Sequence, residues 1–519
     1  MKKPSETTRR ELLRISAGLS MVAAGGSAFG LQLATLGSAA AQTVTPDYRA
    51  LVCIFLFGGN DAHNLVLATD QDSWGRYFSA RNQGADPIAL MPVGSAATPV
   101  GQVSSVTGRT ARRDSPESWG GVIAAGVDVP NPVPAGTNAS QRTFGFHPFL
   151  APLMPIWEAK RLAVMANVGP LIQPTTKQQY RQRSVPLPRS LMSHNDQQST
   201  WQAGSVEGAQ LGWGGGMADA LLSMNGQNSV YTAISTAGNA VFLAGLNVVQ
   251  YQVATGASTP AVRINGAQGS SLFGASGGPA RLAEIIRDTG GANVFVKEYG
   301  GRVGRSIDSA SQLNTAFTGP TVQAIPAPPQ ITNPATGALE TNQLAVQLQT
   351  VARMIAANQS LGLKRQVFFV SMGGYDTHDE QNRQQSVLLN RLANAMAYFD
   401  GVLGNIGGAD LRNSVTTFTA SDFSRTFTTN GDGTDHAWGA HHLVMGGAVR
   451  GRQVYGQFPT IGIDEGSFNN PDMSGNILIP TTSVDQYAAT MGRWFGVPDS
   501  SLNSIFPNLK NFQSSPAFV

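Results

Sequence analysis

The chain has 519 residues, of which 41% are hydrophobic and only 13% are charged, and its formal net charge is +3 at pH 7. This composition supports a sizeable core and excludes a disordered chain. No block of Lys and Arg is interleaved with aromatic residues, so we do not expect a nucleic-acid partner.

The first 41 residues have the pattern of an export signal. Arg9 and Arg10 form a twin-arginine pair, an Ala-, Gly- and Ser-rich apolar stretch follows, and three alanines at 39–41 precede Gln42. A charged, then apolar, then small-residue order is typical of a cleaved signal, and this one resembles the twin-arginine type. An uncleaved membrane anchor is the alternative. We therefore expect the twin-arginine export machinery as a partner, a periplasmic or secreted mature chain 42–519, and no membrane span after signal removal.

Apolar runs alternate with helical patterns along the mature chain. The runs cover 50–57, 162–168, 366–371, 414–420 and 443–445. Runs that are apolar at both odd and even positions are typical of strands buried on both faces of a parallel sheet. Helical patterns cover 149–159, 196–202, 214–224, 279–288, 340–361 and 386–403. The alternation predicts an α/β fold, a mostly parallel central sheet with helices on both faces.

Three segments interrupt this alternation. Residues 85–140 are rich in Gly, Pro, Ala and Ser, which indicates a loop-rich insertion. Residues 229–270 alternate polar and apolar residues, which predicts antiparallel hairpins that form a small β-rich cap. Residues 320–334 have the composition of a Pro-rich linker. The single cysteine, Cys53, lies in the first apolar run, so we expect it to be a buried small hydrophobe without a disulfide partner.

Aspartates and histidines gather after the predicted strands. Asp61, Asp376 and Asp422 each follow a strand, at the edge where functional residues of such sheets collect. His378 lies two residues beyond Asp376, and Asp435 is followed by His436. Carboxylate oxygen and imidazole nitrogen are suitable ligands for zinc, manganese and related ions. The pattern predicts at least one divalent metal site; ordinary hydrogen-bonding roles for these side chains are the alternative.

Ser193 begins the predicted helix that contains residues 196–202. A serine at this position usually caps the helix through its hydroxyl. The same position also favours an anion or a covalent adduct, because the free N–H groups and the helix dipole carry positive charge there. On the residues alone, capping is the favoured role.

Several motifs together resemble a known family. They are the twin-arginine signal, Gly-Gly-Asn-Asp (58–61), Gly-Phe-His-Pro-Phe-Leu (145–150), Ser-His-Asn-Asp-Gln-Gln (193–198), Gly-Gly-Tyr-Asp-Thr-His (373–378) and Gly-Thr-Asp-His (433–436). The set is similar to that of an exported bacterial family of unknown function, domain-of-unknown-function family fifteen-oh-one, placed in the alkaline-phosphatase-like superfamily. The resemblance covers nearly the whole mature chain and implies an alkaline-phosphatase-like fold.

The resemblance also implies roles for individual residues. Ser193 would be the nucleophile, Asp61 and Asp422 would hold one ion, and a second ion would be held by Asp376, His378 and His436. Candidates to contact an anionic substrate are Asn60, His194 and Arg425, and Asp435 would have a supporting role.

The sequence departs from the superfamily pattern at two points. Phe423 stands where the related enzymes keep a histidine, so one metal would lose a ligand unless His441 or His442 replaces it. Asp376 and His378 are two residues apart, whereas the phosphatases space this pair by four. The number of ions, one or two, and their identity as zinc, manganese or magnesium therefore stay open.

Two functions follow from the resemblance. The first is an exported metal-dependent hydrolase of phosphate or sulfate esters, with a small anionic ester as substrate. The second is a catalytically degenerate secreted binding or assembly protein on the same fold, which the phenylalanine at position 423 favours.

Overall fold

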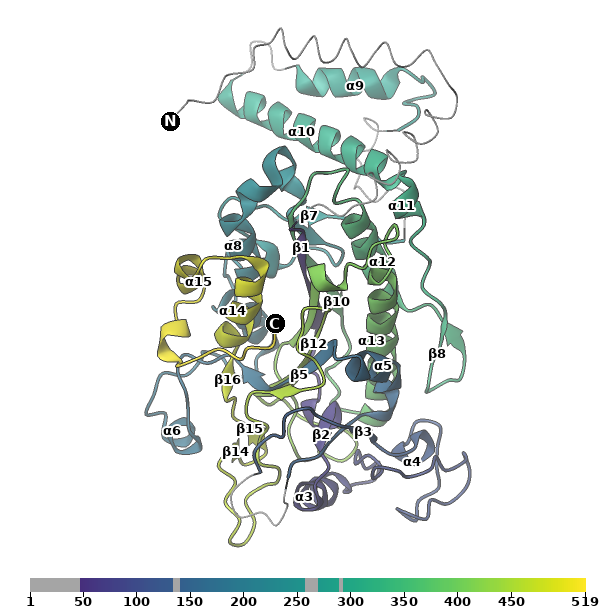
Figure 1. The fold of residues 1–519 in the computed structure, drawn as a ribbon, viewed down its shortest axis with the longest axis vertical. Helices are drawn as coiled ribbons and strands as arrows, with labels where there is room; N and C mark the ends of the chain where they lie inside the picture. Colours follow the sequence, from purple (N-terminus) through teal and green to yellow (C-terminus); the bar gives the residue numbers. More distant parts are fainter. Residues whose placement is uncertain (1–46, 134–140, 257–268, 289–292) are drawn as a thin grey trace, which may run out of the picture.

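The computed structural model describes residues 47–133, 141–256, 269–288 and 293–519 (Figure 1). The predicted export signal at 1–41 lies outside the described residues. Within them, no helix is long and apolar enough to cross a membrane.

A nine-stranded sheet forms the centre of the molecule. Eight of its strands follow the order β13 (Val454–Tyr455), β5 (Leu162–Gly169), β12 (Ala440–Met445), β11 (Val415–Ser421), β1 (Arg49–Leu56), β10 (Arg365–Met372), β6 (Ala233–Ser235) and β7 (Tyr251–Gln252), while β16 (Thr482–Ser483) pairs with β5. Every pairing is parallel except the two that β12 makes with β11 and β5. The predicted α/β fold with a largely parallel sheet is therefore confirmed, and β12 is its one reversed strand.

Strand β1 supplies side chains to two cores because its residues alternate between the faces of the sheet. Ala50, Val52, Ile54 and Leu56 enter the core that includes α12 (Gln343–Ala356) and α13 (Gln381–Leu403). Leu51, Cys53 and Phe55 enter the other core, with α8 (Trp213–Ala220), α14 (Val484–Phe495) and α15 (Asp499–Ile505). Figure 1 shows α12 and α13 on one side of the sheet and α8, α14 and α15 on the other. Cys53 is buried, as predicted.

Local sequence sets the ends of the helices. Helix α14 begins with a capping box in which Ser483 and Gln486 exchange side-chain and backbone hydrogen bonds, and it stops at Gly496 in the left-handed conformation. The predicted helix 149–159 is divided into a 3₁₀ segment (Pro148–Leu153) and α5 (Met154–Glu158), because Pro152 and Pro155 cannot donate to the preceding turn.

The predicted antiparallel cap is wrong in its described part. Strand β6 pairs with β10 and strand β7 pairs with β6, both in parallel, so they extend the central sheet. Residues 257–268 lie outside the described residues. The expected linker at 320–334 instead contains α11 (Pro320–Gln323) and β8 (Ile331–Thr332), which pairs with β9 (Leu339–Glu340).

The remaining elements surround this centre. They are α3 (Gln71–Arg81), α4 (Pro116–Trp119), α6 (Lys177–Gln182), α7 (His194–Ala203), the helical pair α9 (Gly278–Arg287) and α10 (Val294–Phe317), a three-stranded antiparallel sheet of β2 (Val66–Ala68), β4 (Phe144–Phe146) and β3 (Ile123–Ala125), and the hairpin of β14 (Met473–Ser474) and β15 (Ile477–Leu478). The described part of the insertion at 85–140 is mostly irregular, as its composition indicates.

Candidate metal centre

The direction of the strands brings distant residues to one edge of the sheet. Strands β1, β10 and β11 are parallel, so their carboxyl ends meet there, and Asp376 and Asp422 follow β10 and β11. Because β12 runs the opposite way, the residues that precede it arrive at the same edge, among them His436. His194, the first residue of α7, completes the group.

A close backbone approach fixes the loop that carries Asp376. Gly58 has φ +116°, and a Cβ atom there would lie 2.4 Å from the backbone nitrogen of Asp376. Only glycine tolerates both this conformation and this contact. The loop after β1 therefore packs directly against the loop after β10.

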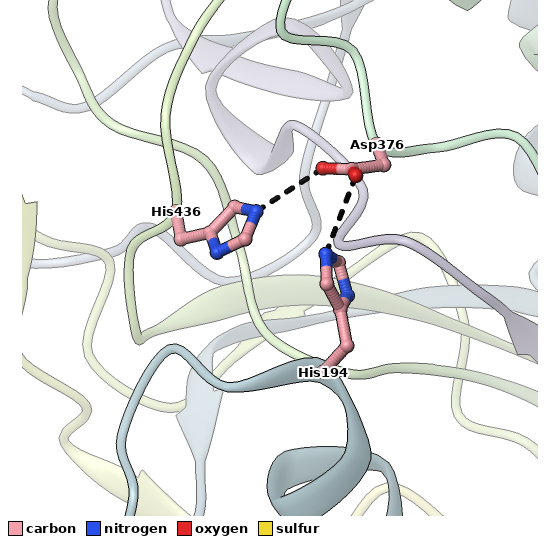
Figure 2. Close-up of side chains that lie close together, drawn as sticks. All are labelled: His194, Asp376 and His436. Carbon is pink, nitrogen blue, oxygen red and sulfur yellow. Dashed lines mark hydrogen bonds and ion pairs between the residues drawn. The ribbon is translucent and has the colours of Figure 1, made fainter.

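Two imidazoles converge on the Asp376 carboxylate (Figure 2). His436 Nε2 is 3.1 Å from Asp376 Oδ1, and His194 Nε2 is 3.4 Å from Oδ2. One ligand atom from each of the three residues lies within 4.8 Å of the other two. His378 adjoins this group, with Nε2 2.9 Å from His436 Nε2 and 3.2 Å from Asp376 Oδ1.

The outer nitrogen of each ring faces an acceptor. His436 Nδ1 is 2.9 Å from the Met192 carbonyl oxygen, which can only accept, so Nδ1 carries the hydrogen. His194 Nδ1 faces Asp422 Oδ2 at 2.8 Å, and His378 Nδ1 faces Asp435 Oδ1 at 3.2 Å. In the neutral rings, all three Nε2 atoms then present lone pairs toward a carboxylate. Lone pairs and a carboxylate repel one another unless a proton or a cation lies between them, and this donor set fits a divalent metal.

The surroundings favour an ionised carboxylate and a neutral His436. Burial by itself would raise the pKa of Asp376, but the hydrogen bond from the Arg425 guanidinium and the charge of that group outweigh it and lower the pKa to about 2. Burial lowers the pKa of His436, and the nearby charge of Arg425 adds to the effect. The pKa of His194 is instead raised, chiefly by its hydrogen bond to Asp422.

Arg425 does not have the predicted role. Its side chain is fully buried, Nε donates to Gly59 O at 2.9 Å, and Nη1 donates to Thr434 O at 3.1 Å. Nη2 donates to the Tyr375 carbonyl oxygen and to the Asp376 carboxylate. These bonds leave Arg425 no path to a substrate. It is a positioning residue for Asp376, which corrects the expected substrate contact.

Asp61 and Asp422 do not form the predicted metal pair. Both Asp61 oxygens bind the buried guanidinium of Arg81, at 2.5 and 3.1 Å, and Gln381 Nε2 donates to Oδ2 at 2.6 Å. Asp422 is fully buried behind His194, and its Oδ2 also accepts from Gln198 Nε2 at 2.8 Å. Asp61 is therefore half of a structural ion pair, and Asp422 orients a histidine.

His441 and His442 also lie away from the centre, within strand β12. The His442 ring packs edge-on against Trp201 at 4.7 Å, and the His441 ring stacks on Phe458 at 4.6 Å. Burial lowers the pKa of each to about 3. Neither ring replaces the histidine missing at position 423, which corrects the metal role expected for His442.

Ser193 and Asn60 lie in the loops around the centre. Ser193 is half-buried, it directly precedes α7 at the N-cap position, and its hydroxyl makes no capping hydrogen bond. Ser190 and Met192 just before it are in the left-handed conformation, with φ 49° and 70°. Asn60 is buried; its backbone N–H donates to Ser421 Oγ, and among the described residues its Oδ1 has no partner.

The sequence predicts a substrate contact for His194, whereas the structure places its Nε2 atom 3.4 Å from Asp376 Oδ2, among the candidate metal ligands. The phenylalanine at position 423 was the sequence feature that could have pointed to another histidine. Its ring lies 4.8 Å from that of His194. An imidazole from α7, that of His194, lies beside Phe423 and faces Asp422 Oδ2 at 2.8 Å.

Residues 307–506 match the model of a family described as "Protein of unknown function (DUF1501)". The match supports the domain-of-unknown-function family suggested by the motifs. It contains Asp376, His378, Asp422 and His436, whereas His194 lies before it. A comparison with curated proteins finds no match to the chain. The family description assigns no activity, so function has to be argued from the site.

Proposed function

We propose that the chain is an exported metal-dependent hydrolase of phosphate or sulfate esters on an alkaline-phosphatase-like fold. His194, Asp376 and His436 would hold one divalent cation, with His378 as an adjoining fourth ligand. The observation that carries this proposal is the convergence of imidazole Nε2 atoms on one carboxylate while each Nδ1 faces an acceptor. A mixed nitrogen and oxygen donor set favours zinc or manganese over magnesium.

The surrounding residues hold the ligands in place. Asp422 orients His194, the Met192 carbonyl orients His436, and Arg425 holds the Asp376 carboxylate. Such outer partners fix ring orientation and tautomer in metal centres. A bound cation would polarise the ester oxygen.

Ser193 is the proposed nucleophile, since it directly precedes His194 and its hydroxyl is free of a capping bond. Its Oγ would form a bond to phosphorus or sulfur while the ester bond breaks, and the serine proton would end on the departing alcohol. Water would then hydrolyse the seryl ester and regenerate the hydroxyl. The start of α7 favours the anionic group through its N–H groups and dipole.

The test combines metal analysis with a panel of aryl phosphate, phosphodiester and aryl sulfate substrates, with zinc or manganese added. We expect about one ion per chain and turnover of at least one ester class. Ser193→Ala should lose turnover and keep the ion, His436→Ala should lose both, and the exposed control Ser205→Ala should lose neither. Absence of a stoichiometric ion refutes the metal centre, and full turnover by Ser193→Ala refutes the nucleophile.

A binding or assembly protein is the second candidate. It is favoured by the burial of Asp61 and Arg425 in structural contacts, which leaves one candidate ion position rather than two among the described residues. A tightly bound ion together with no turnover of any substrate in the panel would support this alternative.

A further inference from the structure

A cavity of about 670 Å³ lies next to the backbone that carries Ser193 and His194. Its walls come from α6, from the segment that follows it, and from residues 190–192. Met192 belongs to both places: it lines the cavity, and its carbonyl oxygen accepts the hydrogen of His436 Nδ1 at 2.9 Å. Met192 therefore connects the cavity to the candidate metal centre.

The apolar part of the cavity wall is firmly packed. The Tyr180 ring lies 5.5 Å from the Trp438 ring, and Leu187 and Leu191 pack against the same small core. Helix α6 is held at its start by a capping box of Thr176 and Gln179. The wall thus presents a fixed aromatic and aliphatic surface, which suits a flat apolar group.

The polar part of the wall is positively charged. Arg181 and Arg183 line the cavity, and no acidic residue does. Arg181 shares the single carboxylate of Asp464 with Lys177, which binds it at the shorter distance of 2.7 Å against 3.3 Å. Within the part of the chain that the structure describes, Arg183 has no acidic residue in ion-pair distance. The wall therefore has positive charge that is not balanced locally.

We propose that this cavity binds the alcohol part of the ester substrate, and that this part is an aromatic or similarly flat group with its own negative charge, such as a carboxylate. The flat group packs on Tyr180 and Leu191, and its negative charge accepts hydrogen bonds from the guanidinium groups of Arg181 and Arg183. The inference rests on the proposed function, in which the ester bond would lie at Ser193, the residue that follows Met192 of the cavity wall.

The test measures binding separately from turnover. Naphthalene-2-carboxylate and its neutral amide have the same ring system and differ in charge. Titration calorimetry with the metal-loaded protein should give about tenfold tighter binding of the carboxylate, the effect of one charge-assisted contact. Arg183→Gln should remove most of this preference, and Tyr180→Leu should weaken both probes. The control Arg281→Gln, on the distant helix α9, should behave as wild type.

Equal binding of the two probes to the wild type, or an unchanged preference in Arg183→Gln, would overturn the inference. A KM comparison of 4-carboxyphenyl phosphate with phenyl phosphate separates it from the proposed function. Turnover of both esters with equal KM would contradict the inference and would still support the proposed hydrolase. Selective probe binding without turnover of any ester would contradict the proposed hydrolase activity. The cavity would then be a binding site for aromatic anions, and the substrate role assigned to it would be overturned.

Discussion

At the scale of single residues, three aspartates follow neighbouring strands, and their partners give them different roles. The Asp61 and Asp422 side chains are fully buried, one against Arg81 and the other against His194. The Asp376 side chain is 45% exposed and faces the Nε2 atoms of His194 and His436. Only Asp376 is therefore placed to share a cation with histidines.

Replacing Asp61 and Asp376 one at a time distinguishes their roles. Asp61→Asn leaves the Arg81 charge buried without its counterion, so we expect a loss of about 3 kcal/mol in unfolding free energy with unchanged metal stoichiometry. Asp376→Asn should abolish stoichiometric metal binding. Urea denaturation and elemental analysis of both variants provide the measurement. Loss of the ion from folded Asp61→Asn would contradict the structural role.

Some of this site was predictable from position in the chain. Asp376 and His378 follow a strand that the apolar runs reveal, so their place at the carboxyl edge of the sheet follows from the predicted parallel order. His436 was grouped with them by the family resemblance, and it reaches that edge because β12 is reversed. The pairing of Asp61 with Arg81 was not predictable, because it depends on how α3 packs beneath the loop after β1. The place of His194 depends on the path of the chain between β5 and α7, about which local sequence says little.

At the scale of elements, prediction succeeded where strands are long and buried on both faces. Strands β1, β5, β10 and β11 were found nearly to the residue. Strands β6 and β7 are three and two residues long, and so short a segment carries too little pattern to distinguish a sheet edge from a hairpin. Strand β12 begins three residues earlier than its apolar run, so His441 and His442, considered as replacement ligands, lie within the buried strand.

The buried histidines of β12 make stability depend on pH. The pKa of His442 is about 3 in the folded chain, against 6.5 ordinarily, so between these values only the unfolded chain binds the proton. The unfolding free energy should therefore fall as the pH drops below about 6.5, by about 2 kcal/mol at pH 5 for this residue. His442→Phe keeps an aromatic ring beside Trp201 and should reduce the fall.

Urea unfolding at pH 7.5 and pH 5 measures the difference. The control Tyr487→Phe removes the hydroxyl that donates to Thr419 O, and it should cost the same at both pH values. An equal fall between the two pH values in wild type and His442→Phe would show that this ring does not stay neutral in the fold.

At the scale of the whole molecule, the candidate centre joins segments that are far apart in the chain. His194 starts α7, Asp376 follows β10, and His436 precedes β12. A cation shared by these residues would link elements on several strands near the middle of the sheet. Because such an ion binds the folded chain and not the unfolded one, binding adds to the stability of the fold.

Metal removal should therefore lower the melting temperature. At a free zinc concentration of one hundred times Kd, the gain is about 2.7 kcal/mol, which corresponds to a shift of a few degrees in a chain of this size. Differential scanning calorimetry with zinc and then with a chelator measures it. Asp376→Asn should show no shift, and a shift of wild-type size in that variant would place the ion elsewhere.

The reversed strand β12 has a consequence for how this centre can change. Strands β11 and β12 are neighbours in both sequence and sheet, so the segment 422–439 between them leaves and returns at the same edge. That one stretch carries Asp422, Arg425, Asp435 and His436. Exchanging it for a stretch of different sequence would alter His436, the two carboxylates that face His194 and His378, and the guanidinium of Arg425 in a single step, while the strand order stays intact. Recombination or design could therefore change the candidate centre by replacing this one segment.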